Sequence, residues 1–365
     1  MTTNCKICNS DTTPVSVEMG VCLKCIRTDA EGARELADQA HWRARRSYGL
    51  PEQAPHAPDG VYCNICCNEC SIPPGVMGYC GLRENRDGIL EGVSADHGKL
   101  SWYHDPLPTN CVADWVCAGG TGAGYPEYAY SPGPETGYRN LAVFFHACSF
   151  DCLYCQNFSF KDYTFASETT DVDELSRAVD IRTACICYFG GDPAPQLPFA
   201  LKASRLAIDG TERILRICWE TNGSMEEDLL DEMIEFSLES GGCIKFDLKA
   251  FDENLHLALT GVSNRRTLEN FARIGKKIPV RPVPPLLVAS TLLVPGYIDP
   301  AETGRIARFI ASVDPDIPYS LLAFFSRFKM GDLPVTSKEL AEQCLAAARE
   351  EGLTRVRIGN QHLLG

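Results

Sequence analysis

Cys148-Ser149-Phe150-Asp151-Cys152-Leu153-Tyr154-Cys155 follows directly on the apolar run Leu141-Ala142-Val143-Phe144-Phe145. The apolar run predicts a buried strand, so the three cysteines lie in the loop at its carboxyl end. Three thiolates in this C-x3-C-x2-C spacing can hold three irons of a four-iron cluster and leave the fourth iron without a protein ligand. Structural metal sites normally close their shell with four ligands, so this spacing indicates a site that binds something further. The alternative is a zinc loop completed by His146.

Length and charge limit the classes of partner. The 365 residues can hold one large domain and a small one, at roughly 150 residues per domain. The 34 basic and 48 acidic residues give a net charge of −14, which repels phosphate backbones and anionic lipids. We therefore expect no nucleic-acid and no membrane partner. No apolar stretch approaches the roughly 18 residues of a membrane span, and no signal peptide is recognisable, so we expect a cytoplasmic protein.

Cysteine usage is the unusual part of the composition. Of nineteen cysteines, fourteen precede residue 156. In a chain without an export signal, repeated C-x2-C spacing indicates metal binding rather than disulfides. The remaining five lie in apolar contexts and are predicted to be small core residues rather than ligands: Cys185, Cys187, Cys218, Cys243 and Cys344.

The first segment, residues 1–29, contains two C-x2-C knuckles. Their four thiolates match a tetrahedral structural site for zinc or a rubredoxin-like iron, formed by Cys5, Cys8, Cys22 and Cys25. Residues 30–60 predict a polar helix, from about residue 31 to Tyr48, and then a linker rich in proline and alanine.

Two further segments precede the apolar run. Residues 61–100 carry a second metal-binding set, predicted to be Cys63, Cys66, Cys70 and Cys80, with Cys67 as a spare ligand. Residues 101–140 form a loop region rich in glycine and tyrosine. Its glycine run lacks the Lys-Ser/Thr of a phosphate loop, which argues against nucleotide binding. It is either a packed surface loop or a lid in which Cys111 and Cys117 help bind a second iron or an auxiliary cluster.

Strand and helix patterns alternate through residues 141–365. Strands are predicted at 141–147, 184–190, 214–219, 243–248, 286–294 and 318–325. Helices are predicted near 171–180, 196–208, 226–239, 265–277, 300–312 and 337–351. Nearly continuous apolar strands indicate a parallel sheet covered on both faces. Six strand–helix units predict an α/β fold, a partial (β/α)6 TIM-type barrel, whose chemistry gathers at the carboxyl ends of its strands.

Polar motifs occur at those strand ends. The second predicted strand ends in Gly190-Gly191-Asp192-Pro193, and the third in Glu220-Thr221-Asn222. The fourth contains Lys245, Asp247 and Lys249, which strand alternation places on one face. That face is either the barrel interior, where a lysine can hold a carboxylate, or the site of a structural salt bridge with Asp247.

These motifs together resemble the radical S-adenosylmethionine (radical SAM) superfamily, in which an aromatic residue such as Tyr154 precedes the last cluster cysteine. Residues 61–83 and the strand ends are similar to one branch, the glycyl-radical activating enzymes and the AMMECR1/Memo-associated radical SAM proteins. Two residues depart from the pattern. Asp192 replaces the usual glutamate, and Cys67 stands where that branch tends to have proline.

The resemblance implies a set of cofactors and the residues that hold them. Cys148, Cys152 and Cys155 would hold a catalytic 4Fe–4S cluster whose open iron binds S-adenosylmethionine. The residues implied to bind that cofactor are Tyr154, Gly190, Gly191, Asp192, Pro193, Glu220, Thr221, Asn222, Asp247 and Lys249.

The resemblance also implies a hydrogen abstraction from a protein or peptide substrate, with a reductant such as ferredoxin or flavodoxin. The extra cysteines and the tyrosine-rich loop favour a cobalamin-dependent protein C-methyltransferase that modifies methyl-coenzyme M reductase, although no Asp-x-His-x-x-Gly cobalamin motif occurs. The alternative is a glycyl-radical activating enzyme of the pyruvate formate-lyase type. A third hypothesis, of another class, is an iron–sulfur electron carrier or zinc-dependent interaction protein, which would explain only the first 80 residues.

Overall fold

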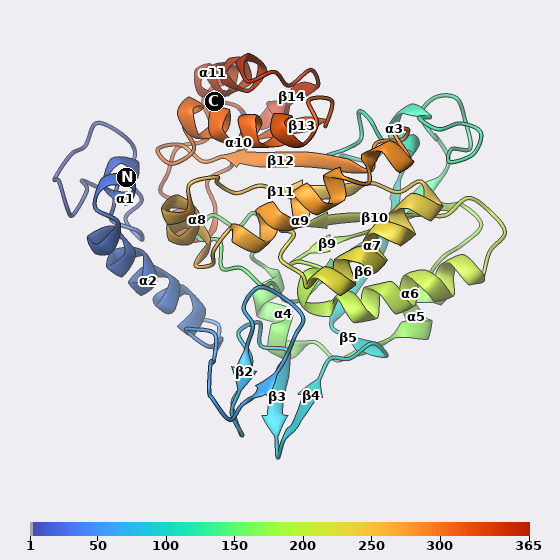
Figure 1. Cartoon of the computed structure of the whole chain (residues 1–365), viewed down its shortest axis with the longest axis horizontal. Helices are drawn as coiled ribbons and strands as arrows, with labels where there is room; N and C mark the ends of the chain where they lie inside the picture. Colours follow the sequence, from blue (N-terminus) through green and yellow to red (C-terminus); the bar gives the residue numbers. More distant parts are fainter. Residues whose placement is uncertain (1–2) are drawn as a thin grey trace.

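The computed structural model describes residues 3–365, and its centre is an open eight-stranded sheet (Figure 1). The strand order is β14-β13-β12-β11-β10-β9-β7-β6. Strands β7 to β14 in this sheet run parallel, and β6 pairs antiparallel with β7. The strands are β6 (Leu100–Pro106), β7 (Arg139–Phe145), β9 (Thr183–Gly190), β10 (Arg216–Thr221), β11 (Ile244–Asp247), β12 (Leu287–Leu293), β13 (Tyr319–Ala323) and β14 (Val356–Gly359).

This sheet confirms the predicted α/β class and extends the predicted barrel at both edges. The six predicted strands correspond closely to β7 and β9 to β13. Strand β14 was not predicted because it is short and only half buried. Strand β6 was not predicted because Leu100 is its one buried residue, so this edge strand forms no apolar run.

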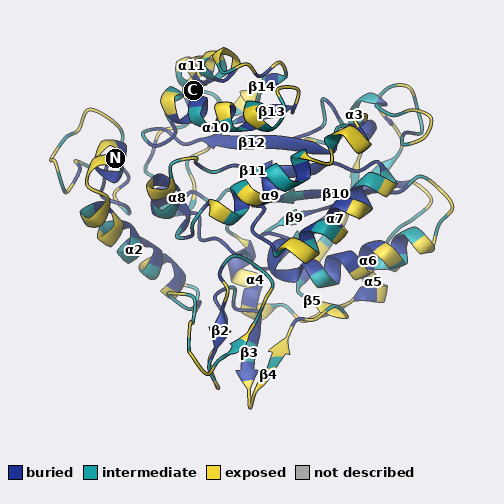
Figure 2. Ribbon diagram, viewed as in Figure 1, coloured by how far each residue is buried: buried dark blue, intermediate teal, exposed yellow. Residues whose placement is uncertain are grey.

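Helices cover the outer face of the sheet, with their buried stripes turned inward (Figure 2). The six predicted helices are present as α5 (Val172–Arg177), α6 (Leu197–Asp209), α7 (Glu227–Ser240), α9 (Arg265–Gly275), α10 (Pro300–Val313) and α11 (Lys338–Glu350). Their starts follow ordinary capping chemistry: Asp299 accepts from the amide of Glu302 and Ser337 from that of Leu340. Four short helices were not predicted: α1 (Leu23–Thr28), α3 (Ala118–Thr121), α4 (Phe160–Ala166) and α8 (Glu253–Thr260).

The amino-terminal part lies against one side of the barrel (Figure 1). Helices α1 (Leu23–Thr28) and α2 (Ala30–Arg46) both pack on α8. The smaller elements are β1 (Val61–Tyr62), β2 (Ser71–Ile72), β3 (Arg83–Arg86), β4 (Ile89–Gly92), β5 (His97–Gly98), α3 (Ala118–Thr121), β8 (Thr170–Asp171) and 3-10 turns at Ala194–Gln196, Ile278–Val280, Phe328–Met330 and Gln361–Leu363. The division of the chain into five segments stays a prediction.

None of the helices within residues 3–365 combines the length and the apolar character that a membrane span requires.

Candidate active site

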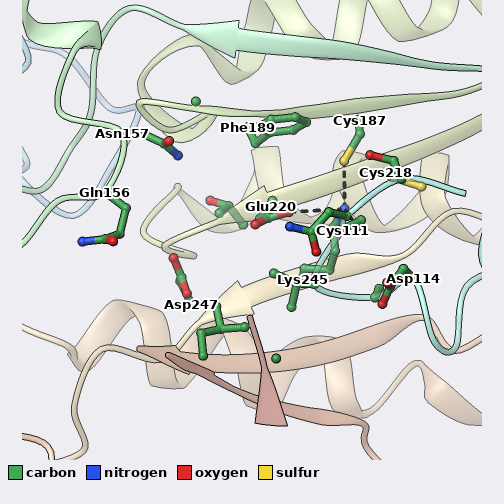
Figure 3. Close-up of a pocket in the computed structure, with 18 of the residues that line it drawn as sticks. Cys111, Asp114, Gln156, Asn157, Cys187, Phe189, Cys218, Glu220, Lys245 and Asp247 are labelled. Atoms are coloured by element: carbon green, nitrogen blue, oxygen red, sulfur yellow. Dashed lines mark hydrogen bonds and ion pairs between the residues drawn. The ribbon is translucent and has the colours of Figure 1, made fainter. Parts of the chain in front are cut away.

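One cavity of about 960 Å³ opens at the carboxyl ends of the strands and extends into the barrel (Figure 3). The loop of residues 148–155, called the cluster loop below, and the polar ends of three strands form its wall. The predicted site residues that line it are Cys148, Cys152, Tyr154, Cys155, Gly190, Gly191, Asp192, Glu220, Thr221, Asn222, Lys245, Asp247 and Lys249. Pro193 does not line the cavity. It is buried behind the wall, where it precedes the 3-10 turn Ala194–Gln196.

The three thiols of the cluster loop are largely withdrawn from water. Burial raises the pKa of Cys152 to about 12 and also raises the pKa values of Cys148 and Cys155. Such thiols keep their protons until a metal cation stabilises the thiolate, and metal binding then releases those protons. Three soft sulfur ligands on the wall of one cavity fit an iron–sulfur cluster.

His146 does not complete a fourth ligand position. Its Nε2 atom lies 3.2 Å from the Ser101 hydroxyl. Its ring packs against Tyr163 with centroids 5.2 Å apart, and the side chain does not line the cavity. The geometry therefore gives no support to the alternative of a zinc loop closed by His146.

Asp151 anchors the cluster loop from behind. Its buried carboxylate accepts from Lys161 Nζ at 2.7 Å and lies 3.0 Å from His41 Nδ1 and 3.9 Å from Arg45. Burial opposes ionisation of this carboxyl. The positive charge of Lys161 and the hydrogen bond with His41 outweigh it and hold the pKa of Asp151 well below its usual range. Because His41 and Arg45 belong to α2, the amino-terminal helix is tied directly to the loop.

Two glycines let the end of β9 pass close to the cluster loop. Gly190 has φ +83°, in the left-handed region. A Cβ atom on Gly191 would lie 2.1 Å from the carbonyl oxygen of Ala147, which cannot move without shifting the backbone. The amide of Gly191 donates to Phe145 O at 2.8 Å, so this segment is fastened to the strand that carries the cysteines.

Asp192 joins the ends of β9 and β10. Its carboxylate accepts from the amide of Ala194 at 2.8 Å, from Thr221 Oγ1 at 3.0 Å and from the amide of Asn222 at 2.6 Å. Burial raises the pKa of Asp192 to about 6 even though these hydrogen bonds favour the ionised form. Both oxygens are engaged by the protein, so the side chain positions its neighbours, while the adjacent glycine backbone remains the surface that faces the cavity.

The charged residues of β10 and β11 form pairs along the cavity wall. Lys245 Nζ lies 3.7 Å from the carboxylate of Glu220, and Lys249 Nζ lies 2.5 Å from that of Asp247. Two alternatives were predicted for these residues, a position inside the barrel and a structural salt bridge. The structure shows both, because the residues line the cavity and are also salt-bridged. Burial raises the pKa of Glu220 to about 7, against the opposing effect of Lys245. Asn222 Nδ2 reaches toward the cluster loop, 2.8 Å from Ser149 Oγ.

The amino-terminal cysteines converge as predicted. The sulfur atoms of Cys5, Cys8, Cys22 and Cys25 all lie within 4.8 Å of one another. Cys5 and Cys25 are 3.7 Å apart, and Cys8 and Cys22 are 3.8 Å apart. This is the grouping that one tetrahedral metal ion requires. The identity of the metal stays a prediction.

The second predicted set is arranged differently. Cys63, Cys66, Cys70 and Cys80 line one small pocket next to β2 and β3. Within residues 3–365, however, the amino-terminal four are the one group with three or more ligand atoms inside 4.8 Å. The second set therefore stays a prediction. Cys67 does not line that pocket, and its amide donates to Ser224 O.

Of the five cysteines predicted to be core residues, four have a position that was not predicted. All five are buried, as predicted. Only Cys344, on α11, is remote from the cavity. The other four line its inner part together with Cys111 and Cys117 of the loop region. The signal was available in the alternation along β9, which puts Cys185 and Cys187 on one face.

Comparison with known proteins agrees with this geometry. Residues 142–310 match the sequence profile of the Radical SAM superfamily. An uncharacterized protein of Methanocaldococcus jannaschii is 25% identical over 307 residues, 82% of this chain and 81% of its own length. Pyruvate formate-lyase 1-activating enzyme of Escherichia coli K12 is 28% identical over 205 residues, 52% of this chain and 78% of the enzyme.

Two further matches are more limited. Isethionate sulfite-lyase activating enzyme of Oleidesulfovibrio alaskensis is 31% identical over 140 residues, 38% of this chain and 41% of the enzyme. A solved domain of a pyruvate-formate lyase-activating enzyme from Bacteroides vulgatus is 20% identical with a TM-score of 0.38, and the match covers 48% of this chain and 98% of that domain. The sequence profile and the named relatives confirm the predicted resemblance. Residues 142–310 are a radical SAM domain, and the protein is an enzyme.

Proposed function

We propose that this enzyme abstracts a hydrogen atom from a polypeptide and acts as an activating enzyme for a glycyl-radical protein. The observation that carries the proposal is that three thiols of the cluster loop and the ends of β9, β10 and β11 line one and the same cavity. Two of the relatives named above are activating enzymes, whose names state the enzymes that they act on.

The cluster thiols and the strand ends have separate tasks in this proposal. Cys148, Cys152 and Cys155 hold the 4Fe–4S cluster. When bound there, a reduced cluster supplies the electron that cleaves S-adenosylmethionine to the 5′-deoxyadenosyl radical. The backbone of Gly190 and Gly191 offers close carbonyl contact to the amino group of that cofactor.

The charged wall residues orient the rest of the cofactor. Glu220 can accept hydrogen bonds from ribose hydroxyls, and Lys249 can pair with a carboxylate. Although burial opposes a charge here, the paired carboxylate of Asp247 outweighs it and raises the pKa of Lys249. The lysine therefore stays protonated and can bind an anion. Tyr154 is 2% exposed and forms part of the cavity wall, where its ring would help to keep water from the reacting groups.

The alternatives of the sequence analysis differ in their support. Cobalamin-dependent methylation of methyl-coenzyme M reductase stays a prediction that neither the cavity residues nor the named relatives favour. The electron-carrier hypothesis does not account for three strand ends that converge on the cluster loop. The reductant, ferredoxin or flavodoxin, also stays a prediction.

Anaerobic reconstitution with iron and sulfide, followed by dithionite and S-adenosylmethionine, tests the proposal. We expect 5′-deoxyadenosine from the unaltered chain and none from Cys152→Ala. Cys344→Ser is the matched control, because it removes a buried thiol remote from the cavity, and it should retain the activity. Adding candidate peptides deuterated at glycine Cα should place deuterium in the 5′-deoxyadenosine. Product formation without any transfer from glycine Cα, while another labelled position does transfer, would overturn the activating role.

A further inference from the structure

The inner end of the cavity is a floor of thiols, formed by Cys111, Cys117, Cys185, Cys187, Cys218 and Cys243. They come from four places in the chain. Two lie on β9, one on β10, one directly before β11 and two in the loop that leads into α3. All six are free cysteines.

The strand register brings two of these thiols side by side. Cys187 of β9 pairs with Cys218 of β10 in the parallel ladder. Directly opposed residues of neighbouring strands point to the same face of a sheet. Cys111 reaches the same part of the cavity from the loop, and Figure 3 shows Cys111 and Cys187 at Lys245, with Cys218 next to Cys187. The thiol floor therefore has a centre, formed by Cys111, Cys187 and Cys218.

A buried ammonium group lies at that centre. Lys245 is 1% exposed, and its Nζ atom lies 2.8 Å from Cys187 Sγ and 3.3 Å from Cys111 Sγ. The carboxylate of Glu220 is farther away, at 3.7 Å. Two other cations line this part of the cavity, and both are already paired: Arg216 with Glu135 and Arg357 with Asp114. The sulfurs are therefore the closest acceptors of Lys245, and a positive charge at this distance favours the thiolate form that binds metals.

The sulfurs of the thiol floor are grouped less closely than those of the amino-terminal cysteines. In the described part of the chain, no group of three thiol-floor sulfurs falls within 4.8 Å, as the amino-terminal cysteines do. The thiol floor is therefore too wide for a single tetrahedral ion. A cluster of several irons spreads its thiolate ligands around a larger body.

Two members of the thiol floor are less suited to binding iron. Cys185 Sγ lies 3.4 Å from Asn140 Oδ1 and is engaged there. Cys243 is only 1% exposed. Cys117 shares the loop of Cys111 and is only partly buried. Without Cys185 and Cys243, four of the six cysteines remain as candidate ligands.

We propose that Cys111, Cys117, Cys187 and Cys218 bind an auxiliary iron–sulfur cluster on the thiol floor, with Lys245 as a hydrogen-bond donor to it. Each thiol that binds iron loses its proton. Assembly from a mixture of ferrous iron, ferric iron and sulfide therefore releases protons and needs no further oxidant or reductant. The site is separate from the cluster loop and does not depend on the proposed function. It would place a second one-electron centre in the cavity that holds the cluster loop.

The test measures iron in matched variants. The background is Cys148→Ala/Cys152→Ala/Cys155→Ala, which lacks the cluster-loop thiols. To this background either Cys111→Ser/Cys187→Ser/Cys218→Ser or the control Cys344→Ser is added. After anaerobic reconstitution, the first addition should lower bound iron by at least about two atoms per chain, and the control should not change it. Equal iron in all three proteins would overturn the proposal, whatever the result for S-adenosylmethionine cleavage.

A second measurement does not depend on whether these variants fold. Crystals of the unaltered reconstituted protein should show iron anomalous scattering beside Lys245, apart from the peak at the cluster loop. Lys245→Met should keep this iron and lower the reduction potential of one cluster, because it removes a hydrogen bond to sulfur. Anomalous density at the cluster loop but none beside Lys245, with Cys111 and Cys187 free or joined as a disulfide, would contradict the assignment.

Discussion

Asp192 offers the sharpest test of how the site is built. Its carboxylate is 4% exposed and accepts three hydrogen bonds, two of them from the backbone amides of Ala194 and Asn222. Asp192→Ala leaves both amides buried without an acceptor, at about 1–3 kcal/mol each. The hydroxyl of Thr221 can rotate toward another acceptor. We therefore expect the free energy of unfolding to fall by about 4 kcal/mol.

Asp192→Asn should cost less. Its amide oxygen can still accept from Ala194 and Thr221. Its NH2 group would face the amide of Asn222, which then has no acceptor, and this costs about 1–3 kcal/mol of stability. Denaturant unfolding of the metal-free chain at pH 8, followed by tryptophan fluorescence, measures both. Asp209→Ala, at the exposed end of α6, is the control for loss of an acidic residue. The reasoning is refuted if Asp192→Ala costs no more than this control, or if Asp192→Asn costs as much as Asp192→Ala.

Three further outcomes follow from the same structure. Gly191→Ala places a Cβ atom against the carbonyl oxygen of Ala147. Equilibrium dialysis should show at least a roughly tenfold loss of S-adenosylmethionine affinity, about 1.4 kcal/mol, and unchanged affinity would count against the predicted backbone contact. Burial lowers the pKa of His256 to about 4, below the unfolded value of about 6.5, so the unfolded state binds its proton more readily. This contribution to stability is complete above about pH 6.5 and is lost as the pH falls toward 4, by up to about 3 kcal/mol. In pH-dependent unfolding, His256→Gln should flatten this slope, and an unaltered slope would contradict it. Cys8→Ser should remove the amino-terminal metal and expose residues 3–29 to proteolysis while 5′-deoxyadenosine formation per bound cluster is kept, and a protease-resistant variant would speak against a metal that holds this segment.

Much of the barrel could be predicted because its strands are nearly uniform apolar runs. Every residue of β12 is buried, so its sequence carries a clear signal. Strand β6 carries a weaker one, since one side of an edge strand stays accessible. Helix α8 is only eight residues long. Its packing on α1 and α2, which lie far away in the sequence, is a tertiary feature that local periodicity does not record.

The candidate site was predictable where it consists of contiguous motifs. The cluster loop and the strand ends at residues 190 and 220 line one cavity because carboxyl ends of parallel strands meet at one edge. The role of Asp192 could not be predicted in this way, because two of its three partners, Thr221 and Asn222, lie at the end of another strand. The thiol floor was missed for a similar reason. Cys111 and Cys187 are 76 residues apart, and only the folded chain brings both to Lys245.

The central claim is that Cys148, Cys152 and Cys155 leave one iron of a four-iron cluster open to S-adenosylmethionine. Pulsed electron–nuclear double resonance on the reduced, reconstituted protein tests it most directly, with the cofactor labelled with 15N at its amino group. The account predicts a resolved coupling between that nitrogen and the cluster, absent in Cys152→Ala and retained in Cys344→Ser. A fully loaded cluster that shows no coupling to the labelled nitrogen would contradict it.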